Sequence, residues 1–233
     1  MAPFGASRAG LMSVRRDAIP DNGLLHDFNP ESLDLSDSDT VESWSDSEGS
    51  LTVTGSAKYV ETGHADKPAV EFNRSDGDVL SETDADVSQE FAIFAVSEAN
   101  DDGNFQDMVG STNDREIELA YDFRSDNRNY RITAAGDGFV GGDVTTDPIV
   151  YSGLIQDNVG DGSELRINKN VEGTSDDTQG LINGITIGER RGGEDGSFDG
   201  KIYRILIYDT DDIDKDGIEE IEDGLIDKYS VPT

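Results

Sequence analysis

The feature that most constrains the fold is a short apolar run near the C-terminus of the chain. Residues 202–208 are apolar or aromatic apart from Arg204, and the run as a whole favours a pleated backbone. It is opened by Gly200 and is followed closely by an acidic cluster. A run of this length with these boundaries predicts a strand that is buried on both faces.

The residues after this run have a different period. Ile218, Ile221, Leu225 and Tyr229 recur at intervals of three and four residues, which places them on one face of a helix. A buried strand that leads into an amphipathic helix predicts that the chain ends with a helix packed on a sheet.

The rest of the chain predicts short strands that alternate with turns. The expected strands are residues 24–28, 51–54, 69–72, 91–96, 117–121, 130–133, 139–140, 148–155, 165–168, 181–188 and 201–209. About twelve short strands with such spacing indicate a two-sheet antiparallel sandwich. We therefore expect an all-β fold with three parts: an N-terminal arm (1–20), a jelly-roll domain (21–209) and a C-terminal helix (210–233).

Both ends of this region resemble laminin-G-like domains, which belong to the concanavalin A-like jelly-roll group. The final strand resembles theirs in Phe198-x-Gly200-x-Ile202 and Ile205-Leu-Ile-Tyr-Asp209. The opening segment resembles theirs in Leu24-Leu-His-Asp-Phe28 and Val41-x-x-Trp44-x-Asp46-x-x-Gly49. The resemblance covers roughly residues 24–230, and it implies a fold more than a function.

The charge of the chain is strongly unbalanced. It has 18 basic and 51 acidic residues, for a net charge of −33. Such a surface repels itself unless salt shortens the screening length, from about 8 Å at physiological strength to about 3 Å near 1 M. We expect a surface adapted to molar salt, in a halophile or in an agent that infects one. The alternative is an ordinary acidic surface that keeps the protein soluble. Nucleic-acid binding is disfavoured because it needs clustered Lys and Arg.

Residues 1–20 are the least acidic stretch of the chain. Phe4 and Leu11 are apolar anchors, and Arg8, Arg15 and Arg16 add positive charge. We expect an arm that docks on a partner subunit, or alternatively a disordered tail. The segment lacks the apolar centre of a signal peptide, and no apolar run is long enough to span a membrane. With no cysteine, disulfides and thiolate metal sites are excluded.

One segment has the spacing of a calcium-binding loop. Asp212, Asp214, Asp216 and Asp223 take positions 1, 3, 5 and 12 of such a loop, with Gly217 at position 6. The alternative is that Asp214 caps a helix that begins at the next residue. The two cannot both hold in full, because a helix there prevents the sharp turn at the glycine. Acidic loops at 34–46, 98–107, 176–177 and 194–195 could also hold cations, such as calcium, that bridge to sugar hydroxyls; the alternative is that they are solvated halophilic surface.

Catalysis has little support in the sequence. Laminarinase-type hydrolases of the concanavalin A-like group carry Glu-x-Asp-x-x-Glu on a strand, and Glu116 and Glu118 lie in the nearest string here. The acid/base residue is missing, so we expect these two carboxylates on the solvent face of an alternating strand. His26 and His64 lack a partner motif. Trp44 is expected to enter the edge of the core, or alternatively to stack on a sugar.

These observations together predict a non-enzymatic virion structural protein of a haloarchaeal virus. The fold is typical of exposed recognition surfaces, the charge is halophilic, and no secretion signal is seen. We expect it on the particle surface, as a turret, capsid decoration or tail fibre, assembled in the host cytoplasm. Its expected partners are other virion proteins, further copies of itself and a host-surface glycan. The alternatives are an extracellular carbohydrate-binding or adhesion module of a haloarchaeon, and a glycoside hydrolase.

Overall fold

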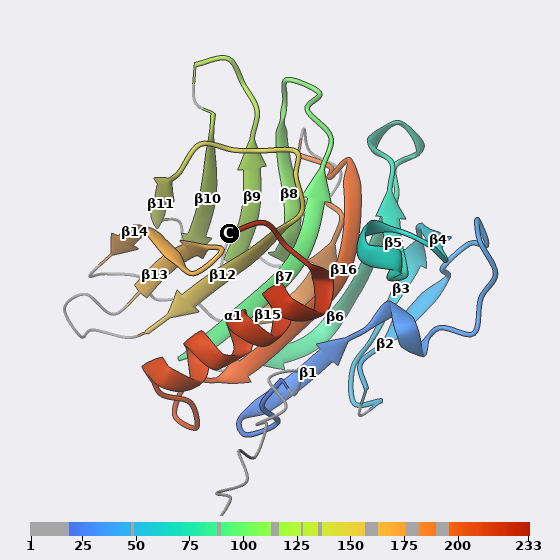
Figure 1. Ribbon diagram of the computed structural model, residues 1–233. Helices are drawn as coiled ribbons and strands as arrows, with labels where there is room; N and C mark the ends of the chain where they lie inside the picture. The colour runs from blue at the N-terminus through green and yellow to red at the C-terminus, as the bar shows by residue number, and fades with distance from the viewer. Residues whose placement is uncertain are drawn as a thin grey trace, which may run out of the picture.

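The structure is a computed structural model of the 233-residue chain. It describes residues 19–47, 49–87, 90–112, 117–126, 128–134, 137–156, 163–175, 182–189 and 196–233. The expected arm residues Phe4, Arg8, Leu11, Arg15 and Arg16 therefore lie outside the described residues, as does Glu116. Two eight-stranded sheets and one α-helix make up most of the described chain (Figure 1).

The first sheet, sheet A, contains the apolar run. Its strands in spatial order are β14 (Asn170–Ser175), β13 (Ser163–Ile167), β12 (Ile149–Ile155), β7 (Phe91–Ala99), β16 (Gly200–Asp209), β5 (Ala69–Phe72) and β4 (Lys58–Val60). β1 (Leu24–Phe28) pairs with the second half of β16, whereas β5 pairs with the first half. Both lie on the edge of β16 that is opposite β7. All pairings described for this sheet are antiparallel.

The second sheet, sheet B, faces the first. Its order is β11 (Asp137–Gly141), β10 (Asn129–Ala134), β9 (Ile117–Asp122), β8 (Phe105–Ser111), β15 (Ile182–Ile187), β6 (Val79–Val87), β3 (Thr52–Ser56) and β2 (Ser43–Ser45). Three 3₁₀ turns join the strands in the first part of the chain: η1 (Pro30–Ser32), η2 (His64–Asp66) and η3 (Arg74–Asp76). The expected all-β, antiparallel jelly-roll sandwich is confirmed.

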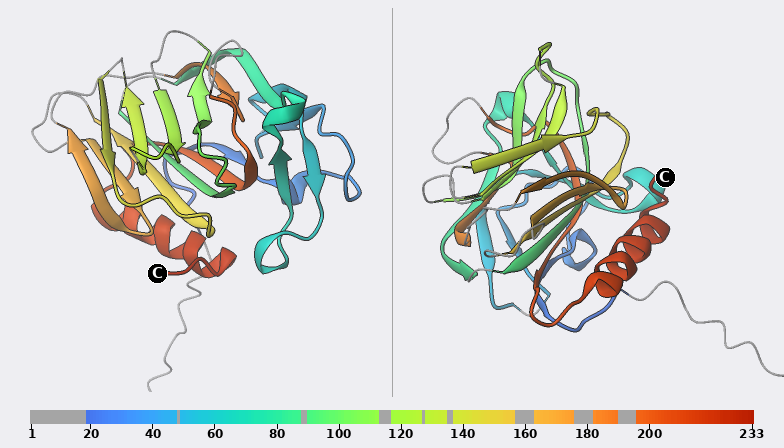
Figure 2. Two further views of the ribbon diagram at one scale, coloured as in Figure 1. Left: turned by 90° about the horizontal axis from the view of Figure 1, so that it is seen from above. Right: turned by 90° about the vertical axis from the view of Figure 1, so that its left-hand side faces the viewer.

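Two apolar clusters hold three layers together. The first lies between the sheets and includes Ile205 and Ile207 of β16. The second lies between sheet A and the helix α1 (Lys215–Tyr229) and includes Leu206 and Tyr208 of the same strand. Alternate residues of β16 thus enter different clusters, which confirms that this strand is buried on both faces. Figure 2 shows α1 on the side of sheet A away from sheet B.

The helix α1 lies on the sheet through the residues that the sequence places on one face. Ile218, Ile221, Leu225 and Tyr229 are all buried against sheet A. Ser230 ends the helix in the left-handed conformation, with φ of 50°. No helix in the described part of the chain is long and apolar enough to cross a membrane.

A buried ion pair fixes α1 on sheet A. The Glu222 side chain is fully buried, and its Oε1 accepts hydrogen bonds from Ser152 Oγ at 2.8 Å and Arg166 Nε at 3.0 Å. Arg166 Nη2 donates to Glu222 Oε2 at 3.0 Å. By contrast, the next helix residue, Asp223, forms an exposed pair with Lys169 at 2.7 Å. The two acids therefore differ in burial while sharing one turn of helix.

We predict that Glu222→Ala lowers the free energy of unfolding by about 3–5 kcal/mol, because the Arg166 charge is left buried without its main partner. Asp223→Ala is the matched control and should cost less than about 1 kcal/mol, since its pair is exposed. Chemical denaturation in one fixed salt concentration measures both. Equal losses in the two variants would show that the buried pair does not anchor the helix.

Candidate binding face and the predicted site residues

The outer face of sheet B is polar, unlike the outer face of sheet A. On β9, Ile117, Leu119 and Tyr121 enter the core between the sheets. Because side chains alternate along a strand, Glu118 and Asp122 point away from that core. The outer face of sheet A is instead apolar and covered by α1. The outer face of sheet B therefore carries polar groups where that of sheet A carries apolar ones.

A continuous row of small or polar residues crosses this outer face. Each member pairs with the next in the strand register, from one edge of sheet B to the other. In spatial order the row is Gly138, Thr133, Glu118, Gly110, Thr186, Ser81, Thr54 and Ser43. We call it the polar row. It crosses all eight strands with hydroxyls, two glycines and one carboxylate.

Glu118 is the only acid of the polar row. It lies between Thr133 on β10 and Gly110 on β8. A β-carbon at Gly110 would lie 3.2 Å from Thr186 Oγ1, so the glycine allows the Thr186 side chain to lie close to the backbone of β8. Glu118 is only 5% exposed. The expectation that it lies on a solvated strand face is therefore wrong, because every residue of β9 is buried.

A second group on the same face surrounds the Phe105 ring. The guanidinium carbons of Arg124 and Arg131 lie 5.2 and 5.8 Å from its centroid. Arg124 donates to both Asp122 oxygens, at 2.8 Å from Nε and 2.5 Å from Nη2. These bonds raise the pKa of the Arg124 guanidinium, which keeps it charged. Arg131 Nε donates to Thr133 Oγ1 at 3.2 Å, which joins this group to the polar row.

Sequence reasoning missed Phe105 and Arg131. β8 was not expected at all, because its register shifts between Asp107 and Val109 and the shift interrupts its alternating pattern. The signal that could have found the face is the repeat of a single polar residue between two apolar ones. It occurs in Ile117-Glu118-Leu119, Tyr130-Arg131-Ile132 and Ile185-Thr186-Ile187.

His26 does have partners, although the sequence showed no motif for them. Its Nδ1 lies 2.7 Å from Asp46 Oδ2, and Ser50 Oγ donates to the same oxygen at 2.7 Å. Burial would raise the pKa of the Asp46 carboxyl, but the hydrogen bonds from His26, Ser50 and the Leu51 backbone lower it. Ser50 approaches the ring nitrogen that already faces Asp46. A catalytic triad needs the opposite ring nitrogen for the serine, so this cluster fixes a turn.

Trp44 cannot stack on a sugar in this structure. It lies on β2, its side chain is 0% exposed, and its ring meets Phe28 edge-on at 5.6 Å between centroids. The prediction that it enters the edge of the core is confirmed, and the sugar-stacking alternative is wrong. An aromatic ring must be exposed to bind a sugar face.

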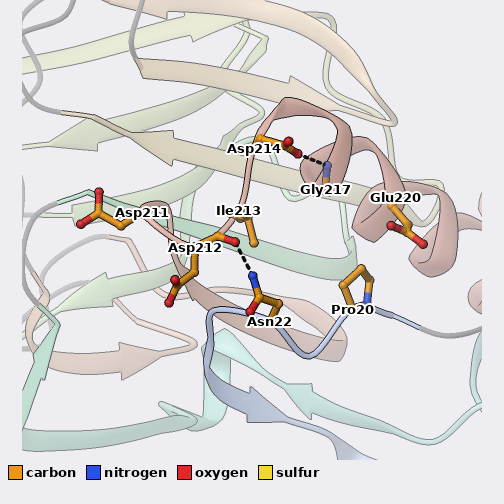
Figure 3. Close-up of a pocket in the computed structure, with 8 residues that line it drawn as sticks. All are labelled: Pro20, Asn22, Asp211, Asp212, Ile213, Asp214, Gly217 and Glu220. Atoms are coloured by element: carbon orange, nitrogen blue, oxygen red, sulfur yellow. Dashed lines mark hydrogen bonds between the residues drawn. The ribbon is translucent and has the colours of Figure 1, made fainter.

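The residues of the predicted calcium loop lie partly before the helix α1 and partly within it. Asp214 caps α1, accepting a hydrogen bond from the Gly217 backbone N–H at 2.9 Å (Figure 3). Asp223 lies in the helix and pairs with Lys169. The four carboxylates, Asp212, Asp214, Asp216 and Asp223, therefore do not form the predicted loop. Within the described ranges, no three acidic or histidine side chains are grouped closely enough to hold a metal ion.

An open pocket of about 500 Å³ does lie at this helix start. Asp211, Asp212, Asp214 and Glu220 line it together with Pro20 and Asn22, and the Asn22 side-chain amide donates to the Asp212 carbonyl (Figure 3). The carboxylate of Asp211 points away from that of Glu220 in Figure 3. The pocket thus marks where the segment before β1 meets the connection from β16 to α1.

The acidic loops are partly neutralised. In the 98–107 loop, Glu98 pairs with Lys201, Asp101 with Arg128 and Asp102 with Arg74. In the 34–46 loop, Asp46 belongs to the buried histidine cluster. Residues 176–177 and 194–195 lie outside the described residues. Several of the carboxylates expected to hold cations therefore already have protein partners.

The sequence matches no family model and no curated protein. Solved structures share its fold. Domain 4 of AbnA, an extracellular GH43 arabinanase from Geobacillus stearothermophilus, was solved with arabinotriose. It is 17% identical with a TM-score of 0.58, over 81% of this chain and 93% of that domain. Trypanosoma rangeli sialidase with sialic acid is 13% identical with a TM-score of 0.59, over 93% of this chain.

The binding domain of botulinum neurotoxin serotype D/C is also similar. It is 9% identical with a TM-score of 0.57, over 87% of this chain and 52% of that one. The chain spans about a third of the sialidase, 35% of its length. At these identities the likeness concerns the fold alone. The chain is a jelly-roll-like β-sandwich of the kind found in these proteins.

We predict that Asp214→Ser leaves the unfolding free energy close to that of the wild type, whereas Asp214→Ala lowers it by about 1 kcal/mol. Serine keeps the capping oxygen but removes the carboxylate that a calcium site would need. Thermal melts with Ca²⁺ and with a chelator, in constant high salt, should give one midpoint for the wild type. A calcium site would be supported if the wild-type midpoint fell with chelator and the Ser variant were as unstable as the Ala variant.

Proposed function

We propose that the chain is a non-enzymatic glycan-binding module whose binding surface is the outer face of sheet B. The polar row is the observation that supports this most directly. It runs across eight strands on the sheet face that α1 does not cover; Gly138, Thr54 and Ser43 at its ends are exposed, whereas Thr133, Glu118 and Thr186 at its centre are buried. A row that crosses eight strands without a large apolar side chain suits a long polar ligand.

The chemistry of the polar row matches sugar hydroxyls. Each hydroxyl of a sugar both donates and accepts hydrogen bonds, and so do the Ser and Thr hydroxyls of the row. The half-buried Arg131 beside the row adds donors. Strands lie about 4.8 Å apart, so a glycan lying across them meets a polar group at regular intervals.

The comparisons are consistent with this proposal. The arabinanase domain was solved with a bound arabinotriose, and it shares the sandwich over most of its length. The sialidase and the neurotoxin binding domain share the fold as well. The proposal for this chain depends on its own outer face, because the identities are low.

A glycoside hydrolase is the second candidate, and one observation favours testing it. Asp122 lies on the same strand face as Glu118, and Asp107 lies on the adjacent strand of that face. Carboxylates that share a sheet face are what acid/base hydrolysis of a glycosidic bond requires. Our proposal assigns no catalytic role to them, so wild-type protein should release no reducing ends from the glycans it binds.

We predict that wild-type protein is retarded by at least one polysaccharide in affinity electrophoresis across neutral and acidic polymers. Glu118→Gln should weaken that binding by about tenfold, because this buried carboxylate, which has an interaction within the protein, holds the centre of the polar row in place. Glu71→Gln, the same charge change on β5 of sheet A, is the control and should change nothing. Retardation by no polymer would contradict glycan binding. Release of reducing ends that Glu118→Gln abolishes would contradict a non-enzymatic role.

The finer proposal concerns where the module works. The net charge of −33 supports a role in molar salt, and a recognition fold suits the outside of a particle. We place the chain on the virion of a haloarchaeal virus, as a turret, decoration or tail fibre that contacts the host glycan. An extracellular adhesion module of the host is the alternative setting.

We predict that antibodies against the chain label the outside of purified virus particles in electron micrographs. The physical reason is that a glycan-binding face must be exposed before the particle reaches a cell. Antibodies against an internal core protein, tested on intact particles, provide the unlabelled control. Recovery of the chain only as a secreted monomer, with no particle association, would contradict the virion setting.

A further inference from the structure

Arg131 differs from the other arginines that the structure describes. Each of the others forms an ion pair: Arg74, Arg124, Arg128, Arg166 and Arg204. Arg131 forms none with any described residue. In a chain with 18 basic and 51 acidic residues, an arginine without an acidic partner is unexpected. Among the described residues, its position is therefore set by contacts other than an ion pair.

The Arg131 guanidinium is held in place by neutral groups. Its Nε donates to Thr133 Oγ1 at 3.2 Å, and its plane lies near the Phe105 ring, 5.8 Å from the centroid. The side chain is half-buried. Ala120 faces it on β9, where a larger residue would fill the space beside it. Both terminal nitrogens are without a hydrogen-bond acceptor among the described residues, and the Thr133 and Phe105 contacts hold them in one orientation.

The charges around this guanidinium do not cancel it. Arg124 shares the Phe105 ring, but Asp122 is its bidentate partner. Asp107 and Glu118 lie on the same sheet face; both are buried, and each has an interaction within the protein. Val140 of β11 pairs with Arg131 in the strand register, and its exposed side chain adds an apolar neighbour. A fixed planar fork of this kind matches a carboxylate, which accepts two parallel hydrogen bonds.

We infer that Arg131 is a specificity-determining residue that binds the carboxylate of an acidic sugar on this face. The ligand class is therefore a glycan with uronate or sialate units. This inference rests on the proposed glycan-binding function and names its substrate class. The carboxylate of the sugar would lie at the Arg131 terminal nitrogens, and the rest of the sugar would lie over the exposed end of the polar row at Gly138, beside the exposed Val140.

Matched ligand pairs test this inference by isothermal titration calorimetry in one fixed salt concentration. The first pair is tetragalacturonate and its methyl ester, and the second is 3′-sialyllactose and lactose. Within each pair the acidic group is the main difference. We expect the acidic member of at least one pair to bind wild-type protein about tenfold or more tightly, as a charge-assisted bidentate contact implies.

Arg131→Gln should remove that preference, and Thr133→Val, which removes the Nε acceptor, should reduce it. Arg128→Gln is the matched control, because Arg128 is also partly exposed and stacks on a ring, Phe123, but has Asp101 as its partner. It should keep the wild-type preference. Thermal melts establish that the variants are folded.

The outcomes separate the two proposals. Equal binding of acidic and neutral members, unchanged in Arg131→Gln, would overturn the role of Arg131 and leave glycan binding standing. An acidic preference that Arg128→Gln abolishes and Arg131→Gln retains would place the anion elsewhere and also overturn it. Failure of the wild type to bind any member, together with failure to bind any polysaccharide, would overturn glycan binding itself.

Discussion

The structure depends on the burial of one strand, β16, from both sides. Ile205 and Ile207 contact the opposite sheet, whereas Leu206 and Tyr208 contact the helix. Side chains of this size each contribute about 1.5–3 kcal/mol when they are fully buried. β7 pairs along one edge, and β5 and β1 divide the other. The single charge inside the run, Arg204, is neutralised by a bidentate pair with Asp27.

This double burial makes the two outer faces unlike each other. Covering sheet A with a helix requires apolar residues on its outer face, which then cannot recognise a polar ligand. Sheet B has no helix over it among the described elements, and its outer face carries the polar row instead, with Thr133, Glu118 and Thr186 buried. The same asymmetry explains why the buried pair of Glu222 and Arg166 lies under the helix, where a charge needs a partner, while Arg131 lies on the other face.

The sequence predicted elements whose signal is local and missed those that depend on pairing. The helix followed from apolar spacing and from Asp214 as a cap, and β16 and β7 followed from their continuous apolar runs. β8 was missed because its bulge breaks the alternation. The polar row could not be predicted, because it joins residues from Ser43 to Thr186 through strand register. The calcium spacing was misleading, since a capped helix also has acids in its first turn.

The entry of the chain into the fold has a geometric consequence. Tyr208 donates a hydrogen bond to the Pro20 carbonyl, and Ile19 lies against Gly224 of α1. The backbone preceding β1 thus emerges behind the helix-covered sheet, on the side away from the polar row. A neighbour joined through that end would leave the opposite surface unobstructed. Attachment through this end and exposure of sheet B therefore involve opposite sides of the molecule.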